Sequence, residues 1–393
     1  MKILWVKSDF LHPTTRGGQI RTLEMLKRLH RRHEIHYVAF DVAEQSEGVV
    51  RSPEYCTRAY PIPRRIAPHA SPAFWAEAAR NAFSNLPLSV ARYRSQAMQR
   101  RIAELSGSAS FDAVVCDFLF PAQNIPDLSR VVLFQHNVEA QIWKRRAQHT
   151  APAPLRFYIR GQHRKMWRYE REVCRAVRRI VAVSDQDAEM MRREYGAGDV
   201  RPVPTGVDVD FFSRPPDFDG GPSLLFAGSM DWMPNADGVH WFVSEVLPRI
   251  RKRLPGCTLT LAGRRPGRSV RSLAAKDPAI RVTGTVPDIR PYLWESSVAI
   301  VPLRIGGGTR LKIFEAMAAA LSVVSTTVGA EGLNLRDGEN ICIADTPEDF
   351  ADRCLKLLRD RDARRRIAAA ARELVASRYS WEAVSESFEQ LLF

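Results

Sequence analysis

The residues best suited to chemistry lie in one glycine-rich stretch, residues 305–333. The apolar run Val298–Leu303 before it has the length of a buried parallel strand, and Arg310–Ala320 has helical spacing and strong helix formers. The residues that separate the two are Gly306, Gly307, Gly308 and Thr309. A strand, a glycine loop and a helix in this order direct several backbone N–H groups toward one point, which suits phosphate oxygens. The stretch therefore predicts an anion site at the start of the helix.

Two cations and a carboxylate accompany this loop. Arg310 and Lys312 stand in the first helical turn, where positive charge opposes the helix dipole, and a bound pyrophosphate would explain their presence. Lys312 and Glu315 are three residues apart and therefore share a helical face. Either they form a surface ion pair of little energetic value, or Lys312 binds a phosphate while Glu315 accepts hydrogen bonds from ribose hydroxyls. The spacing fits both interpretations.

The composition is typical of a globular protein with two domains. The chain has 393 residues, 45% of them hydrophobic and 26% charged. No apolar run approaches the roughly 20 residues that span a bilayer, and Lys7 and Asp9 make the N-terminus a first strand rather than a signal peptide. The six cysteines form no CxxC pair, which predicts neither a metal site nor a disulfide framework and favours the cytoplasm.

The positive charge is concentrated in the first half of the chain. Residues 1–206 contain 33 Lys+Arg and 20 Asp+Glu, whereas residues 207–393 contain 25 and 24. The densest part, Arg156–Arg179, has nine cations and two acids with aromatic residues between them. Such a helix suits an anionic membrane surface. Nucleic-acid binding and a merely solvated helix face are the alternatives.

Apolar runs alternate with helical patterns along both halves. The first-half runs are Ile3–Val6, Ile35–Phe40, Ala113–Cys116, Val131–Phe134 and Ile180–Val183, and the second-half runs are Leu224–Ala227, Leu259–Ala262, Val298–Leu303, Val323–Ser325 and Ile341–Ile343. This alternation predicts two doubly wound α/β domains, each with a parallel sheet covered on both faces. A proline-rich boundary at Arg201–Asp210 predicts domains 1–204 and 205–379, with a C-terminal amphipathic helix, 380–393, joined to the first.

Ligands of such sheets bind beyond the carboxyl ends of the strands. We therefore expect the turns Gly228–Trp232, Gly263–Arg265 and Gly306–Lys312 to converge, in a cleft between the two domains.

With these patterns in place, the chain resembles a retaining glycosyltransferase of family four, and the resemblance implies the GT-B fold of two facing Rossmann-like domains. The motifs that carry it are Gly17-Gly18, His136-Asn137-Val138-Glu139, Val183-Ser184, Pro204-Thr205-Gly206-Val207-Asp208, Phe226-Ala227-Gly228-Ser229, Gly284-Thr285-Val286 and the stretch 305–333. Residues 130–150 and 224–242 also resemble sugar transferases of bacterial exopolysaccharide clusters, including those associated with PEP-CTERM/exosortase systems.

The resemblance implies a role for each matching residue. Donor binding is implied for Gly17, Gly18, Gly228, Ser229, Gly263, Thr285, Val286, Gly306, Gly307, Gly308, Thr309 and Glu315, and a catalytic role for His136. We add Arg310 and Lys312 to the catalytic residues as a hypothesis, for the reason given below. Within this set, Glu315 would hold the ribose, and His136 would lie by the sugar hydroxyls and the reacting carbon. From its sequence context alone, His136 is equally interpretable as a structural hydrogen bonder before a helix capped by Asn137.

The chain departs from the family pattern at two places. Gly307 stands where the first glutamate of the family's Glu–seven residues–Glu motif is expected, so recognition of the donor sugar must come from elsewhere. The segment Ser229–Pro234 also lacks the arginine and lysine with which many relatives neutralise the diphosphate. We therefore hypothesise that Arg310 and Lys312 take over this role.

The resemblance implies a hexosyltransferase, and we expect it to need neither a metal nor a cofactor, because cations and backbone dipoles can supply the positive charge. Its donor would be a nucleotide sugar, expected to be a UDP-sugar, and its acceptor a lipid-linked glycan or an oligosaccharide in cell-surface or exopolysaccharide synthesis. We expect the basic first domain to face the anionic inner leaflet of the plasma membrane, and no nucleic-acid partner. The alternatives are a sugar epimerase or phosphorylase of the same fold, and a non-catalytic nucleic-acid binder.

Overall fold

The computed structural model describes residues 1–14, 17–42, 46–64, 71–108, 110–149, 153–215, 221–305 and 311–393, with the backbone alone at positions 145, 149 and 154. The predicted site residues Gly306, Gly307, Gly308, Thr309 and Arg310 lie outside the described residues. The chain divides into two compact units, which are described separately below. Unit 1 comprises Met1–Pro204 with Val384–Phe393, and unit 2 comprises Thr205–Ala383.

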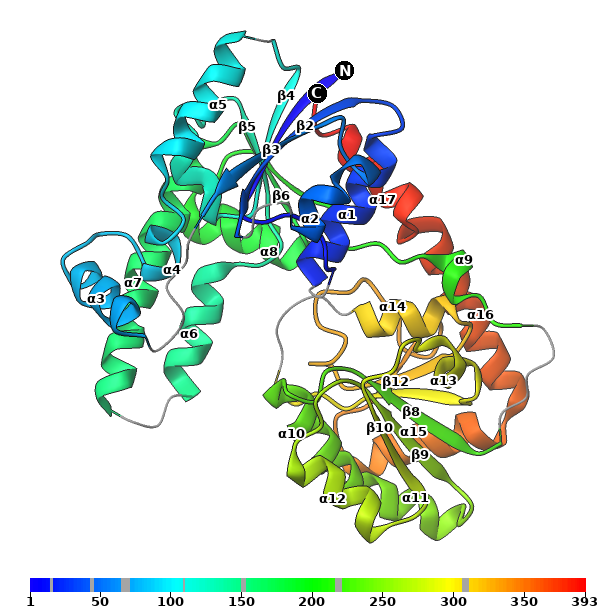
Figure 1. The fold of residues 1–393 in the computed structure, drawn as a ribbon. Helices are drawn as coiled ribbons and strands as arrows, with labels where there is room; N and C mark the ends of the chain where they lie inside the picture. Colours follow the sequence, from blue (N-terminus) through cyan, green and yellow to red (C-terminus); the bar gives the residue numbers. More distant parts are fainter. Residues whose placement is uncertain are drawn as a thin grey trace. The chain divides into compact units, whose positions relative to one another are not determined.

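Unit 1 is built on a parallel sheet of seven strands in the order β3-β2-β1-β4-β5-β6-β7 (Figure 1). The strands are β1 (Lys2–Lys7), β2 (Glu34–Asp41), β3 (Arg58–Pro63), β4 (Ala113–Asp117), β5 (Val131–Phe134), β6 (Arg179–Ala182) and β7 (Val200–Pro202). The strand order reverses at β1, which pairs with β2 on one side and β4 on the other. Such a switch point places the ends of β1 and β4 side by side, where open α/β sheets bind ligands.

The helices of unit 1 cover both faces of this sheet. They are α1 (Gly17–Leu29), α2 (Glu47–Val50), α3 (Pro72–Ala82), α4 (Leu88–Ala91), α5 (Gln96–Ser108), α6 (Glu139–His149), α7 (Ala153–Ala176) and α8 (Asp185–Met190). The C-terminal helix α17 (Trp381–Glu389) begins in unit 2 and ends in unit 1. Its fully buried Phe388 packs against Trp5 and Phe134, with ring centroids 5.8 and 4.8 Å apart. The C-terminal residues thus belong to the core of unit 1.

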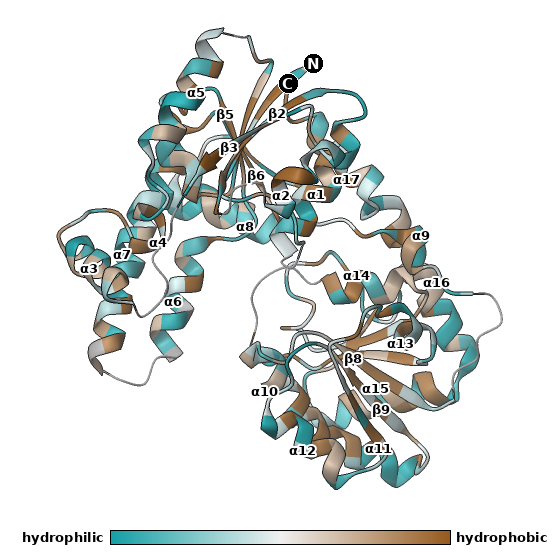
Figure 2. Ribbon diagram, in the orientation of Figure 1, coloured by the Kyte–Doolittle hydropathy of each residue, from teal (hydrophilic) through white to brown (hydrophobic). Residues whose placement is uncertain are grey.

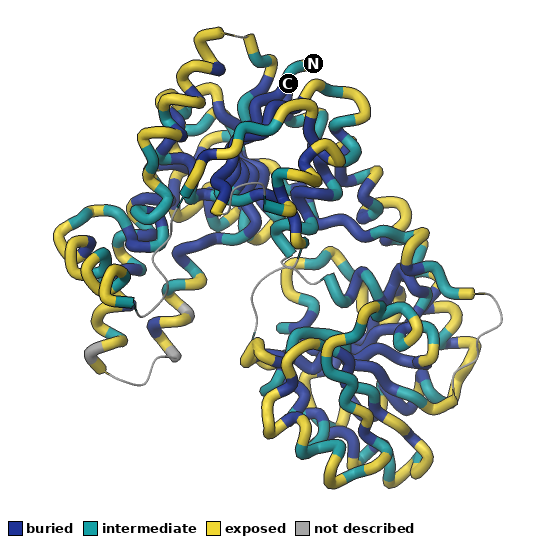
Figure 3. The backbone as a smooth tube through the Cα atoms, viewed as in Figure 1, coloured by how far each residue is buried: buried dark blue, intermediate teal, exposed yellow. Residues whose placement is uncertain are grey.

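Unit 2 contains a second parallel sheet, in the order β10-β9-β8-β11-β12-β13. Its strands are β8 (Ser223–Ala227), β9 (Thr258–Ala262), β10 (Ile280–Gly284), β11 (Val298–Val301), β12 (Ser322–Ser325) and β13 (Cys342–Ile343). Its helices are α9 (Val209–Phe212), α10 (Met233–Trp241), α11 (Leu247–Arg253), α12 (Arg268–Lys276), α13 (Arg290–Trp294), α14 (Leu311–Ala318), α15 (Pro347–Arg359) and α16 (Arg361–Arg378). Figure 2 shows apolar residues concentrated on the strands of both units, and Figure 3 shows the same strands buried.

The fold class predicted from the sequence, two doubly wound α/β domains, is confirmed. Each of the ten predicted runs is a strand, although the run Val298–Leu303 ends as a strand at Val301, directly before Pro302, which has no N–H to donate. The predicted helix 380–393 is observed as α17, which ends at Glu389. No helix in the described ranges is both long enough and apolar enough to cross a bilayer.

Three strands were not predicted, and all three lie at sheet edges: β3, β7 and β10. An edge strand has fewer strand neighbours to pair with, so a weaker apolar pattern suffices, and it tolerates proline. Strand β3 contains Pro61 and Pro63, and β7 ends at Pro202 inside the segment expected to be a linker.

Candidate functional site

In unit 2, the turns that follow β8, β9 and β10 are hydrogen-bonded to one another. The Gly228 N–H donates to the Ala262 carbonyl at 2.9 Å, and the Gly263 N–H donates to the Gly284 carbonyl at 3.3 Å. The backbones approach so closely that a Cβ on Gly263 would lie 1.8 Å from the Gly228 oxygen. The predicted residues Gly228, Ser229 and Gly263 are therefore brought together at the carboxyl edge of the sheet.

Lys312 reaches this edge from the first turn of α14. Its Nζ donates to Asn235 Oδ1 at 2.7 Å and lies 4.5 Å from the centroid of the Phe226 ring. A Cβ added to Gly228 would lie 2.8 Å from the same Nζ. Asn235, buried at the start of α10, donates its Nδ2 to the Ser229 carbonyl at 2.7 Å. One side-chain amide thus links the lysine to the Gly228–Ser229 turn.

A second cation, Arg264, lies at the same turn. Its Nε donates to Ser229 Oγ at 2.7 Å, and its carbonyl accepts from the Met230 N–H at 3.0 Å. The Arg264 side chain is 45% exposed, and its Nε lies 4.0 Å from Asp231 Oδ1. Positive charge therefore lies near the Gly228–Ser229 turn from two elements, α14 and the turn after β9. Arg264 lies in the predicted turn Gly263–Arg265, but neither Arg264 nor Asn235 was predicted as a site residue.

Glu315 and the turn after β10 complete the predicted residues of unit 2. Glu315 is half-buried one helical turn after Lys312, and burial raises the pKa of its carboxyl to about 6, with the charge of Lys312 opposing the shift. Thr285 is exposed and Val286 half-buried, directly after Gly284, whose φ of +73° requires glycine. The Lys312 hydrogen bond described above goes to Asn235, and the ligand role of the Lys312–Glu315 pair stays a prediction.

In unit 1, a buried network surrounds Asp117 at the end of β4. Its carboxylate accepts from Lys7 Nζ at 2.8 Å, Trp5 Nε1 at 2.9 Å and Thr22 Oγ1 at 2.7 Å. Burial alone would raise the pKa of Asp117, but Lys7 and then His136 outweigh it and hold the pKa below its usual range. The carboxylate is therefore ionised at neutral pH.

His136 lies in this network after β5. Its Nε2 is 2.7 Å from Asp117 Oδ1, and burial lowers the pKa of the ring to about 4, against the opposing effect of Asp117. The ring is therefore neutral at pH 7. Since an ionised carboxylate only accepts hydrogen bonds, we assign the proton to Nε2, which leaves Nδ1 as an acceptor.

The acceptor atom of His136 faces the start of α1. Nδ1 is buried and has no hydrogen-bond partner among the described residues. A Cβ on Gly18 would lie 3.7 Å from it, and Thr22 Oγ1 lies 3.0 Å from the Gly18 carbonyl. The structure thus brings two predicted residues, Gly18 and His136, together, with Gly17 at the first position of α1.

Two buried residues that the sequence analysis did not identify hold the His136 segment in place. Arg21 of α1 donates to the Gln135 carbonyl at 2.8 Å and to the Val203 carbonyl. Glu170 of α7 accepts from the N–H groups of Glu139 and Ala140 at 2.9 and 2.8 Å. A carboxylate from another helix therefore serves the N-terminus of α6, where Asn137 had been considered as the cap.

Glu170 also accepts from Gln135 Nε2 at 3.1 Å and from the Tyr195 hydroxyl at 2.9 Å. Burial raises its pKa to about 7, despite these four hydrogen bonds.

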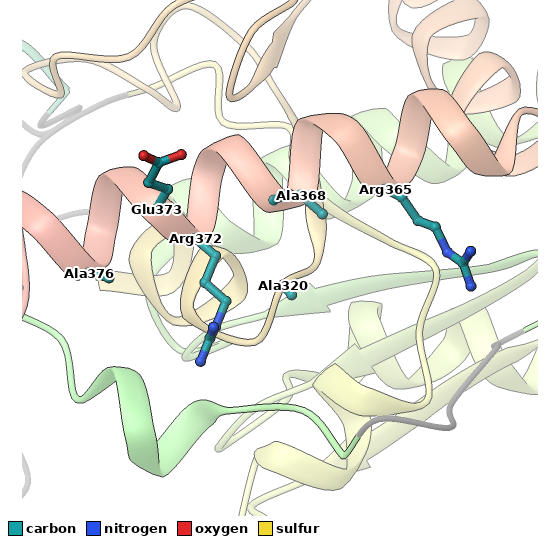
Figure 4. Close-up of a pocket in the computed structure, with 7 residues that line it drawn as sticks. Ala320, Arg365, Ala368, Arg372, Glu373 and Ala376 are labelled. Atoms are coloured by element: carbon teal, nitrogen blue, oxygen red, sulfur yellow. The ribbon is translucent and has the colours of Figure 1, made fainter.

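A surface hollow of about 380 Å³ lies elsewhere in unit 2, along α16. It is lined by Ala320, Arg365, Ala368, Ala369, Arg372, Glu373 and Ala376. Figure 4 shows Arg365 and Arg372 extending from one side of α16 and Glu373 from the other. None of the residues predicted to bind a ligand lines this hollow.

Two family models match the chain. The model described as Glycosyltransferase Family 4 matches residues 15–211, and the model described as Glycosyl transferases group 1 matches residues 221–360. An uncharacterized 44.6 kDa protein in the cps region of Klebsiella pneumoniae is 22% identical over 402 residues, which cover 98% of each chain. The phosphatidyl-myo-inositol mannosyltransferase of Mycobacterium tuberculosis is 30% identical over 218 residues, covering 52% of this chain and 56% of that protein.

Solved structures share the fold over their whole length. The sucrose-phosphate synthase from Thermosynechococcus elongatus superposes with a TM-score of 0.70 at 17% identity, covering 99% of this chain and 98% of that one. The Anabaena protein HepE, in complex with UDP, has a TM-score of 0.70 at 11% identity, with 100% and 99% covered. WaaG, a glycosyltransferase involved in lipopolysaccharide biosynthesis, has a TM-score of 0.67 at 14% identity, with 99% of both chains covered.

Proposed function

The chain belongs to the family-four, group 1 glycosyltransferases, and we propose that it moves a hexosyl group from a nucleotide sugar to a glycan or lipid-linked acceptor with retention of anomeric configuration. The observation that carries the proposal is the Gly228–Ser229 turn, with Lys312 and Arg264 close to it. A nucleoside diphosphate is the anion that such a turn suits, because the two cations can share its charge.

The same arrangement supplies a reason for catalysis. As the glycosidic bond to the diphosphate breaks, the sugar acquires oxocarbenium character and the leaving group gains negative charge. A cation that is already held in place stabilises this charge more in the transition state than in the ground state. We assign this role to Lys312, held by Asn235, and to Arg264, held by Ser229. Arg310, which the sequence analysis placed beside Lys312, keeps that role as a hypothesis.

For the sugar itself, we propose that His136 of unit 1 accepts a hydrogen bond from a hydroxyl. Its neutral ring presents Nδ1 as an acceptor, and the Asp117 carboxylate fixes the tautomer through Nε2. An unpartnered buried acceptor is costly, so a ligand hydroxyl at this atom would remove that cost. This gives Asp117 a positioning role through His136. In unit 2, Glu315 would accept hydrogen bonds from the ribose hydroxyls in its ionised form.

Retention requires the acceptor oxygen to attack the anomeric carbon from the face that the diphosphate leaves. In the proposed step the new C–O bond forms as the bond to the phosphate oxygen breaks. The acceptor's proton passes to the departing diphosphate, so no protein nucleophile takes part. Lys312 and Arg264 would hold that diphosphate in place while it accepts the proton.

The choice of donor, acceptor and cellular role rests on relatives. UDP is proposed because HepE was crystallised with it. A lipid-linked acceptor is proposed because one relative is a phosphatidyl-myo-inositol mannosyltransferase, and we place this acceptor at the inner face of the plasma membrane. A role in exopolysaccharide synthesis agrees with the cps-region relative. The protein would then act as a cytoplasmic enzyme that attaches to the membrane surface without a metal or cofactor.

A panel of nucleotide sugars tests the proposal. The full chain is mixed with UDP-, GDP- and ADP-sugars, and melting temperature and release of nucleoside diphosphate are measured. We expect one nucleotide class to raise the melting temperature of the wild type, and to raise it far less for Lys312→Met. Lys276→Met, an exposed lysine at the end of α12, is the control and should respond like the wild type. No response to any nucleotide diphosphate would overturn the proposal.

A further inference from the structure

Two helices of unit 1, α3 and α7, are joined by hydrogen bonds. Lys165 Nζ of α7 donates to the Asn81 carbonyl at 2.7 Å and to the Ala82 carbonyl at 3.4 Å, at the last turn of α3. Gln162 Nε2 donates to Asn81 Oδ1 at 3.3 Å, and Asn81 is buried. Figure 1 shows α3 beside α7, away from the sheet of unit 1. The two helices are therefore in direct contact at the last turn of α3.

The two helices and the residue directly after α3 carry the most exposed aromatic side chains of the described chain. Phe83, Phe157 and Trp75 are exposed by 96%, 80% and 62%. Leu155 and Tyr158 on α7 add a further 48% and 40% of exposed side chain. A single exposed apolar residue is ordinary, but five of them in or directly after two helices that contact each other are more than scattered exposure, and such a concentration is typical of a contact site.

The charged side chains in the first part of α7 are all positive. The first four turns of α7, residues 153–168, contain five cations and no carboxylate: Arg156, Arg160, Arg164, Lys165 and Arg168. By helical spacing, Phe157, Arg160, Arg164 and Arg168 share one face. The single carboxylate of α3, Glu77, pairs with Arg92 at 3.0 Å. The exposed rings therefore lie on helices that also carry these cations, and Glu172, one turn after Arg168, is the α7 carboxylate on the same face.

We propose that α3 and the first four turns of α7 form a membrane-docking surface, in which Phe83, Phe157 and Trp75 enter the interface of an anionic leaflet. Aromatic rings favour the headgroup level of a bilayer, and neighbouring arginines bind its anionic phosphates. Duplex nucleic acid would use the cations but, with its bases stacked on one another, gives no reason for two highly exposed phenylalanines. The inference rests on the proposed function only in that a lipid-linked acceptor makes such docking useful.

The two components of the surface make separable contributions. Attraction between arginines and headgroups is screened by salt, whereas insertion of rings is not. Binding that survives high salt therefore belongs to the aromatic residues. This separates insertion from the purely electrostatic attraction that any basic protein has for an anionic surface.

Vesicle flotation of the full chain tests the inference, using phosphatidylcholine vesicles with and without phosphatidylglycerol at low and high salt. We expect the wild type to float with the anionic vesicles and the double variant Phe83→Ser, Phe157→Ser to bind them at least about tenfold more weakly, also at high salt. The double variant Arg160→Glu, Arg164→Glu should lose the salt-sensitive part. Val50→Ser removes an apolar side chain that is 65% exposed on α2, and should bind like the wild type.

Binding of the phenylalanine double variant equal to that of Val50→Ser would overturn the inference, as would no vesicle binding by the wild type. Tight binding of duplex DNA by a wild type that ignores vesicles would assign the cations to nucleic acid instead. Quenching of tryptophan fluorescence by brominated lipid, lost in Trp75→Phe, reports insertion directly. Nucleotide-sugar responses are measured without vesicles, so failure there with docking intact contradicts the transferase proposal alone.

Discussion

The two units hold their candidate residues by different means. In unit 1, Asp117 and His136 lie in a buried network of side chains from β1, α1, β4 and the segment after β5. In unit 2, the candidate turns are shaped by backbone contacts between glycines, and the charged groups, Lys312 and Arg264, lie nearer the surface. The candidate site of unit 1 is therefore held by hydrogen bonds between side chains. The candidate turns of unit 2 instead require residues without a side chain at Gly228 and Gly263.

This difference predicts how each site responds to change. A charge removed from the unit 1 network leaves other buried charges without compensation, so stability and function should fail together. A cation removed from unit 2 is more exposed, so function should fail while the fold persists. Substitutions that separate these outcomes test the comparison.

The largest effect is expected for Asp117→Ala. It leaves Lys7 buried without its carboxylate and removes three further hydrogen bonds, which should cost about 3–5 kcal/mol of folding free energy. Urea denaturation measures the loss. Asp127→Ala is the control, because Asp127 is exposed and bonds only locally to Ser129. Similar stabilities for the two variants would contradict the description of the unit 1 network.

Gly263→Ala should come next and should affect unit 2. Its Cβ would stand 1.8 Å from the Gly228 oxygen, which is backbone and cannot swing away, so we expect a loss of roughly 3 kcal/mol and a displaced Gly228–Ser229 turn. Gly267→Ala, in the same loop, meets no atom within 4 Å and should change stability by no more than about 0.5 kcal/mol. Thermal unfolding measures the stability of both variants, and equal melting temperatures would contradict the close approach between Gly263 and the Gly228 oxygen.

Lys312→Met should sharpen the comparison by separating function from folding. We expect kcat/KM for the donor to fall about 100-fold, because one preorganised positive charge at the leaving group is lost, with little change in urea stability. Arg264→Ala, at the more exposed cation, should cost about tenfold. Steady-state kinetics with donor and released diphosphate measure both. Parallel losses of stability and activity would place Lys312 with the structural network instead.

The smallest effect concerns the pH response of Glu315. Its pKa is raised to about 6 in the folded state, so the folded protein binds this proton more tightly than the unfolded chain, and stability falls as pH rises from about 4.5 to 6. Donor affinity should change in the opposite direction, since only the carboxylate accepts from both ribose hydroxyls.

Glu315→Gln should therefore be slightly more stable than the wild type at pH 7 and should bind donor with no pH step near 6. Melting curves and donor titrations between pH 5 and 8 measure both properties. A wild type whose donor affinity does not change below pH 6 would remove Glu315 from ribose binding.

The sequence predicted every inner strand and the edge strand β13, and it missed the three other edge strands, β3, β7 and β10. Strands β1, β4, β5, β8 and β11 are continuous apolar runs because they are covered on both faces. Strand β3, with its two prolines, gives no such signal, and its pairing with β2 comes from tertiary context.

The same limit applies to the candidate sites. Glycines between a strand and a helix can be recognised locally, as can a histidine after a strand. The network of Asp117 cannot, because it joins residues up to 112 positions apart. Glu170 accepts hydrogen bonds at the N-terminus of α6 from a position 30 residues away, so a local sequence pattern cannot predict this role either. Arg264 is adjacent to a recognised glycine, but its direction toward Ser229 depends on how β8 and β9 pair.

The most direct test of the central claim is a calorimetric titration of wild type and Lys312→Met with the nucleoside diphosphate selected by the panel, and with the corresponding nucleoside. The account predicts that the substitution weakens diphosphate binding at least about tenfold and leaves nucleoside binding within about twofold, since the lysine interacts with phosphate alone. Equal weakening of both ligands, or of neither, would contradict the assignment of the Gly228–Ser229 turn as the site of the leaving group.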